Sequence, residues 1–173
     1  ACLGLFSQLR KIYDPADLGF IKPVGQELVE LSDGRKVDKD VIIIDKFSKI
    51  PDIDFDIVSP VQLGSGFTKL FLDSRDQGEE IRKLSEAILS SFRALSHKKI
   101  ILAEGTGHPG VGGIVGLSNA QVSNLIGANI LYLSGGGIGK ALDMLEVDLS
   151  YFLFQARQSL LQYYLQLPHI IYS

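Results

Sequence analysis

The spacing of apolar residues predicts helices and strands along most of the chain. Between Arg75 and Ser96, apolar residues recur at every third or fourth position and charged residues take the opposite face, which predicts a surface helix. The same spacing in "ACLGLFSQLRKIY" predicts a helix at the start of the sequence, without a capping residue before it. The apolar runs in "DLGFIKPV" and "KKIILAEG" predict buried strands, the second covered on both faces as in a parallel sheet.

The second half of the chain repeats this alternation. "SNAQVSNLIG" predicts a helix capped by Ser118 or Asn119 and ended by Gly127, "ANILYLS" a strand, and "GGGIGKALDMLEV" a glycine loop entering another helix. The tail adds "VDLSYFLF" as a strand, "QARQSLLQYYLQL" as a helix and "HIIY" as a last strand, whereas "KVDKDVIIIDKFSKI" mixes helix and strand signals. The order of strand, glycine turn and helix predicts a doubly wound α/β fold in one domain, residues 1–173.

Composition and charge narrow the classes of partner. The 173 residues are 46% hydrophobic and 21% charged, with a formal net charge of -3, which is typical of a globular domain without a basic surface for nucleic acid or anionic lipid. No apolar run approaches the roughly 20 residues that span a bilayer. The lone Cys2 excludes an internal disulfide and a cysteine-based zinc site, so we expect a reducing compartment, the cytoplasm.

The glycine-rich stretch "ILAEGTGHPGVGGIVGLSNAQ", Ile101 to Gln121, is the main candidate for chemistry. Glycines after a strand expose backbone N–H groups that bind phosphate, and they also permit a tight turn between a strand and a helix. For the loop as a whole both interpretations stay open, although we expect Gly110 to Gly116 to serve the turn. The motif G-x-x-x-x-G-K-[ST] is absent, and "GGGIGK" lacks its spacing and its hydroxyl residue.

Charged residues at the predicted strand ends are the candidate site. Glu104 ends an apolar strand, where a carboxylate is suited to Mg²⁺. Asp38, Asp40 or Asp45 is available as a second oxygen ligand, although each taken alone is more often a solvated surface aspartate. Lys22 ends the other strand and is placed to meet phosphate or a carboxylate, unless it is an ordinary lysine at a strand end. His108 is a candidate for oxyanion binding or proton transfer, or an ordinary hydrogen-bonding loop residue.

Several blocks in order resemble one family. "FIKPVG", "VDKD", "SPVQLGSGFTK", "AEGTGH" and "GLSNAQVSNLIGANILYLSGGGIG" are similar to the dethiobiotin synthetase group of P-loop proteins, closest to the relatives that form the N-terminal domain of long phosphate acetyltransferases. The resemblance covers roughly residues 1–147. It implies a parallel sheet, ATP and Mg²⁺ as ligands, and a homodimer. It also implies metal ligation by Asp38 and Glu104, a catalytic Lys22, and nucleotide or substrate binding by Thr106, Gly107 and His108.

Two departures from the family limit the functional prediction. The family's first strand and P-loop are expected before "ACLGLFSQLRK", so we expect a sequence trimmed at its front rather than a domain that lost its phosphate loop. The family's adenine-contacting asparagine is not recognisable after Val147. We expect a nucleotide-sensing or regulatory domain. The alternatives are an ATP-dependent enzyme that activates a carboxyl or carbamate group, and a non-catalytic interaction domain.

Overall fold

The chain forms two compact units, of which the first has mixed α/β structure and the described part of the second is helical. The computed structural model describes residues 2–51 and 53–166, and the units are Ala1–Gly107 and His108–Ser173. Strands pair in twos within the described residues: β1 with β6 and β2 with β5 in parallel, and β3 with β4 antiparallel. The α/β class is confirmed, but these residues form no continuous doubly wound sheet. The single-domain organisation stays a prediction.

A pair of parallel strands lies at the centre of the first unit. β1 (Leu18–Ile21) and β6 (Ile100–Ala103) run in register from Leu18 opposite Ile100 to Ile21 opposite Ala103. Both strands were predicted from their apolar runs. β1 is buried throughout, whereas the side chains of β6 are partly exposed, so the prediction that β6 is covered on both faces is wrong. The reason is that β6 has one hydrogen-bonded neighbour in the described part of the chain.

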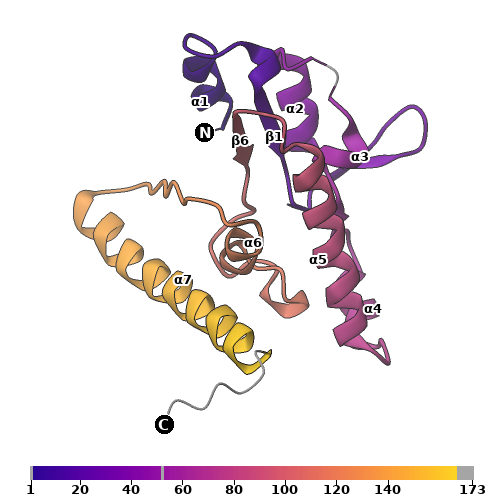
Figure 1. Ribbon diagram of the computed structural model, residues 1–173, viewed down its shortest axis with the longest axis vertical. Helices are drawn as coiled ribbons and strands as arrows, with labels where there is room; N and C mark the ends of the chain where they lie inside the picture. The colour runs from indigo at the N-terminus through magenta and orange to yellow at the C-terminus, as the bar shows by residue number, and fades with distance from the viewer. Residues whose placement is uncertain (1, 52, 167–173) are drawn as a thin grey trace. The chain divides into compact units, whose positions relative to one another are not determined.

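Three helices supply the core over one face of β1. α1 (Cys2–Leu9), α2 (Lys39–Ser48) and α3 (Phe55–Val58) contribute apolar side chains to it, and Figure 1 shows α1 and α2 gathered around β1. The rings of Phe6 and Phe20 lie 6.1 Å apart at a tilt of 58°, a favourable arrangement for an aromatic pair. The buried residues of this cluster are Phe6, Leu18, Phe20, Val41, Ile44, Ile50 and Val58.

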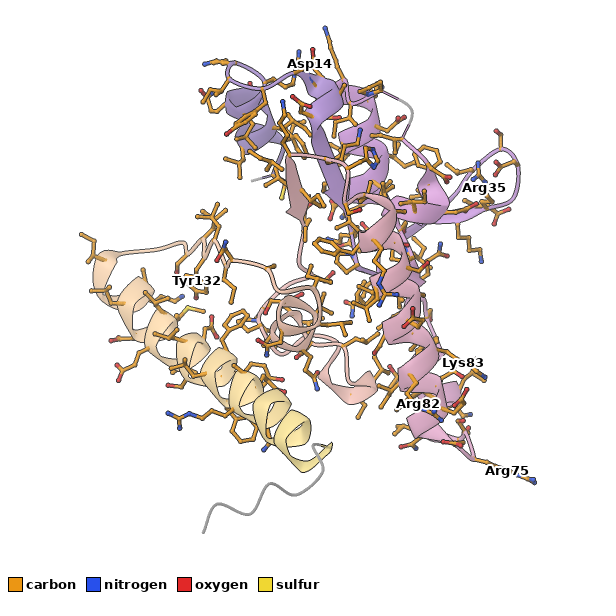
Figure 2. The ribbon with its side chains drawn as sticks, in the orientation of Figure 1. Asp14, Arg35, Arg75, Arg82, Lys83 and Tyr132 are labelled. Carbon is orange, nitrogen blue, oxygen red and sulfur yellow. The ribbon has the colours of Figure 1, made fainter. Side chains whose placement is uncertain are left out.

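Shorter elements complete the first unit. They are η1 (Pro15–Asp17), β2 (Val24–Gly25), β3 (Leu28–Glu30), β4 (Lys36–Asp38), β5 (Val61–Gln62) and α4 (Phe67–Leu72). The predicted surface helix is confirmed as α5 (Gln77–Ala94), which begins after the capping residue Asp76. Figure 2 shows Arg82 and Lys83 extending from this helix, and Arg75 from the turn before it.

The second unit is built from η2 (Gly113–Val115), α6 (Asn119–Ile126) and α7 (Ile138–Gln166). The predicted ends of α6 are confirmed, because Ser118 forms a capping box with Gln121 and Gly127 ends the helix in the left-handed conformation. The loop before α7 is held by Tyr132, whose hydroxyl donates to Asp148 at 2.7 Å (Figure 2).

Two predicted strands of the second unit are wrong. "ANILYLS" has no regular structure, and its Ile130, Leu131 and Leu133 are exposed, because an apolar run becomes a strand only where a partner takes up its backbone hydrogen bonds. "VDLSYFLF" continues α7, as the predicted helix after it does up to Gln166. "HIIY" lies outside the described residues. No helix within residues 2–51 and 53–166 is both long and apolar enough to cross a membrane.

Candidate functional site

The carboxyl ends of β1 and β6 place two of the predicted site residues at one edge. Lys22 directly follows β1 and Glu104 directly follows β6, and the register pairs the residues just before them, Ile21 and Ala103. The backbone N–H of Glu104 donates to the carbonyl of Ile21 at 2.9 Å, which extends the pairing by one step. Lys22 and Glu104 therefore follow paired residues at one strand edge, close enough for the charge of Lys22 to act on the Glu104 carboxyl, and open α/β sheets bind ligands at such edges.

Lys22 is buried and has two acceptors at this edge. Its side chain is 4% exposed, and its Nζ donates to Oδ2 of Asp40 at 2.8 Å and to the carbonyl of Gly105 at 3.1 Å. Asp40 is in the first turn of α2, so the ion pair joins the strand edge to the start of that helix. A buried ammonium requires such partners because its desolvation is costly. Two of the three ammonium protons are thereby engaged, and one remains for a ligand.

Glu104 is half-buried beside this pair. Burial raises the pKa of its carboxyl, the charge of Lys22 lowers it and the charge of Asp40 raises it, with a net upward shift. The thiol of Cys2, in the first turn of α1, donates a hydrogen bond to Glu104. Burial and the Glu104 carboxylate together raise the pKa of the Cys2 thiol to about 11, so the thiol stays protonated near neutral pH. The neutral Cys2 thiol and the Lys22 cation therefore both act on the Glu104 carboxyl.

Asp38 is fixed by backbone donors instead of facing Lys22. It is 2% exposed, and its Oδ2 accepts from the N–H groups of Gln26 at 2.9 Å and Glu27 at 3.2 Å. Its Oδ1 accepts from the N–H of Asp40 at 3.0 Å as the N-cap of α2. Among the three aspartates considered from the sequence, Asp40 is the one that contacts Lys22, and Asp45 is exposed on α2. Because both oxygens of Asp38 are engaged, this residue fits poorly as a metal ligand.

The donor chemistry at the edge permits one direct carboxylate contact with Mg²⁺. Within the described residues, no three His, Cys, Asp or Glu side chains are placed to hold one metal ion. Mg²⁺ is commonly bound by one or two carboxylates, with waters and substrate phosphates completing its shell. Glu104 satisfies that requirement with its half-buried carboxylate, so Mg²⁺ ligation by Glu104 fits the residues present. Ligation by Asp38 stays a prediction that its hydrogen bonds disfavour.

The loop after Glu104 is held in place near the strand edge. The hydroxyl of Thr106 donates to the carbonyl of Val24 at 2.6 Å, and Gly107 has a φ of 60°, in the left-handed region. His108 is exposed and belongs to the second unit, where its Nδ1 accepts from the N–H of Gly110 at 3.2 Å. Its carbonyl accepts from Nδ2 of Asn119 at 2.9 Å. These contacts order the loop, and the nucleotide-binding roles of the three residues stay predictions.

The glycines from Gly110 to Gly116 build a compact turn. Gly112 has a φ of 88°, and a Cβ there would lie 2.4 Å from the carbonyl oxygen of Leu117, so the turn requires glycine at this position. Backbone N–H groups of the turn donate within it, among them those of Val111, Gly113, Val115, Gly116 and Leu117. The expectation that this segment serves the turn into α6 is therefore confirmed, and these five N–H groups are already engaged.

Sequence reasoning missed one neighbour of the site. Cys2 was considered for disulfides and zinc, but not as a hydrogen-bond donor to Glu104. No local signal points to this contact, since the two residues are about a hundred positions apart and meet through the packing of α1 against the core. Comparison of the chain with protein-family models, with curated proteins and with solved structures found no match.

Proposed function

We propose that the first unit binds ATP with Mg²⁺ at the carboxyl edge of β1 and β6 and acts as a nucleotide-sensing or regulatory domain. One observation carries the proposal: a lysine and a glutamate directly follow two paired parallel strands, at the edge where α/β proteins bind ligands. Lys22 supplies positive charge for phosphate, and Glu104 supplies an oxygen for Mg²⁺. The resemblance to the dethiobiotin synthetase group indicates that the nucleotide is ATP.

The partners of Lys22 favour binding over turnover. Its ammonium is held by Asp40 and by the carbonyl of Gly105, so it serves as a fixed charge at the edge. An enzyme that activates a carboxyl or carbamate group would use the same charge to position its acceptor, and it is the second candidate. Release of inorganic phosphate from ATP, measured with and without a panel of carboxylates and amines, separates the two. Stimulation by any acceptor would favour the enzyme.

The sheet to which β1 and β6 belong is part of the same proposal. We infer that β1 and β6 belong to a doubly wound sheet of the P-loop type in which β6 takes a second neighbouring strand. The support is the partial exposure of Ile100, Ile101 and Leu102, which a strand with neighbours on both sides would bury. A homodimer is proposed from the family resemblance, and sedimentation of the purified chain tests it. The cytoplasm is proposed from the free thiol of Cys2.

Titration calorimetry with ATP and Mg²⁺ tests the nucleotide proposal. We expect Glu104→Gln to lose most of the Mg²⁺ dependence of ATP binding, and Lys22→Met to weaken ATP binding by tenfold or more. Glu30→Gln removes an exposed carboxylate of β3 and is the matched control, with unchanged affinity. The absence of ATP binding to the parent chain, or equal Mg²⁺ dependence in Glu104→Gln and Glu30→Gln, would refute the proposal.

A further inference from the structure

A separate pocket lies between α1 and α2 in the first unit. It has a volume of about 190 Å³ and is open to solvent on one side. α1 and the residue after it supply one wall, and the last turn of α2 supplies the other. The residues that line it are Leu3, Phe6, Ser7, Arg10, Phe47 and Ser48. None of the residues at the strand edge lines this pocket, so it is distinct from the nucleotide site proposed above.

Arg10 is the one charged residue among the six that line the pocket. Its Nε is buried and has no hydrogen-bond partner. The guanidinium is permanently charged and its donors lie in a fixed plane, so a buried N–H without an acceptor is unfavourable. None of the ion pairs within the described residues includes Arg10. An anion bound in the pocket would pair with the guanidinium and neutralise its charge.

The other lining residues indicate what the uncharged part of such a ligand would be. Leu3, Phe6 and Phe47 offer apolar surface, and the six lining residues include no carboxylate. Ser48 is 1% exposed, and its hydroxyl oxygen accepts from the N–H of Ile50 at 3.2 Å, which leaves its own proton to donate. Nζ of Lys46 lies 5.7 Å from the centre of the Phe47 ring and adds positive charge near the rim. The surroundings therefore favour an anion with an apolar body.

The size and the charge of the pocket select among anions. Apolar cavities of about 150 Å³ hold benzene, so about 190 Å³ admits a single ring with one small polar group. One guanidinium balances a monoanion, whereas a phosphate dianion requires more donors than Arg10 and two serines provide. We propose that this pocket is a binding site for a small monocarboxylate with an aromatic or branched aliphatic body. Its acid group would pair with the guanidinium of Arg10, and its body would pack on Leu3 and Phe47.

Sodium benzoate is the probe for this site, with benzyl alcohol and inorganic phosphate as comparisons. Binding is followed by titration calorimetry and by the amide chemical shifts of Leu3, Ser7 and Phe47 in the intact chain. We expect benzoate to bind at least tenfold more tightly than benzyl alcohol, and to shift those amides in preference to others. Phosphate is expected to leave them unchanged. Equal affinity for benzoate and benzyl alcohol, or no binding of benzoate, would overturn the proposal.

Variants of Arg10 test whether benzoate binding depends on the positive charge of this residue or also on the planar shape of its guanidinium. Arg10→Gln is expected to weaken benzoate binding at least tenfold, and Arg10→Lys is expected to weaken it too, because lysine keeps the charge but lacks the planar guanidinium. Arg93→Gln, which removes an exposed arginine of α5 paired with Glu86, is the matched control and keeps the parent affinity. Unchanged affinity in Arg10→Gln would overturn the proposal, and circular dichroism checks that each variant folds. If Arg10→Gln fails to fold, the comparison of benzoate with benzyl alcohol on the parent chain still decides the matter.

Discussion

Lys22 and Asp40 form an ion pair between a buried strand end and the first turn of α2. The Nζ and Oδ2 atoms lie 2.8 Å apart, with the lysine side chain 4% exposed and the aspartate side chain 32% exposed. Removal of one member leaves the other charge poorly compensated, whereas removal of both avoids that cost. The pair therefore fixes where α2 begins relative to the strand edge, and it does so through charge as well as packing.

A double-mutant cycle measures this pair. We expect Asp40→Asn to lower the free energy of unfolding by about 1–3 kcal/mol, because it leaves the buried Lys22 without its carboxylate. Combining it with Lys22→Met should cost less than the two single losses added together. Urea unfolding at neutral pH supplies the values, with Asp45→Asn on the exposed side of α2 as the control. Strict additivity of the two substitutions would show that the pair contributes no coupling.

The thiol of Cys2 is expected to titrate at high pH. Its pKa in the folded chain is about 11 against an ordinary value of 9.0, through burial and the neighbouring Glu104 carboxylate. Because the folded pKa is the higher one, this group's contribution to stability is complete below pH 9.0 and is lost as the pH rises through about 11. The chemical shift of the Cys2 Cβ carbon, followed against pH in a buffer with EDTA, reports the midpoint.

Glu104→Gln is the companion variant for this titration. It removes the negative charge beside the thiol, so the pKa of Cys2 should fall toward its ordinary value, though burial keeps it raised. Glu30→Gln should leave the midpoint where it is, because Glu30 is exposed in β3 and is not among the groups that shift this pKa. A Cys2 midpoint that is identical in the parent chain and in Glu104→Gln would contradict the contact between the two side chains.

Gly112→Ala is expected to unfold the turn before α6. The residue has a φ of 88°, and an added Cβ would lie 2.4 Å from the carbonyl oxygen of Leu117, which is backbone and cannot move aside cheaply. A loss above about 2 kcal/mol is expected for α6, read from hydrogen exchange of its amides. Gly127→Ala is the matched control, since its φ of 64° carries conformational strain of about 1–2 kcal/mol but its Cβ meets no atom within 4 Å. Equal losses in the two variants would show that the contact with Leu117 is unimportant.

The capping box of α6 predicts a smaller effect. Ser118 accepts from the N–H of Gln121 at 3.1 Å, and the Gln121 side chain accepts from the N–H of Ser118 at 2.9 Å. Ser118→Ala should cost about 1 kcal/mol in the same exchange measurement. Ser123→Ala, which removes a hydroxyl bonded within the helix, should stay within about 0.5 kcal/mol of the parent chain. A loss in Ser123→Ala as large as that in Ser118→Ala would argue against the cap.

The parts of the fold that follow from local pattern were predictable. α5 has a clear apolar stripe, α6 has explicit start and stop residues, and β1 and β6 are apolar runs followed by charged residues. Parallel pairing of such strands places their ends together. The sequence placed Lys22 and Glu104 at such ends, but it did not predict that these two strands pair. By contrast, "ANILYLS" has the composition of a strand, but pattern alone does not say whether a partner strand is present.

The details of the site depended on where elements begin. The residue pattern offered Asp38, Asp40 and Asp45 without deciding among them, because a shift of α2 by one residue would change which carboxylate caps the helix, and the family resemblance selected Asp38. In the fold, Asp38 takes the capping position and Asp40 is thereby turned to Lys22. The contact between Cys2 and Glu104 depends on how α1 packs, which periodicity does not specify.

The pairing of β1 with β6 has a consequence for how the chain folds as it is made. Lys99 and Asp17, which border the two strands, are 82 positions apart and joined by a hydrogen bond of 2.7 Å. A long loop must close before such a pairing forms, so the chain loses the entropy of loop closure before the strand contacts stabilise it. The helices α5 and α6 need only local contacts. We therefore expect synthesis on the ribosome to leave the backbone edge of β1 unpaired until β6 has emerged, which makes this interval the time of greatest exposure to aggregation.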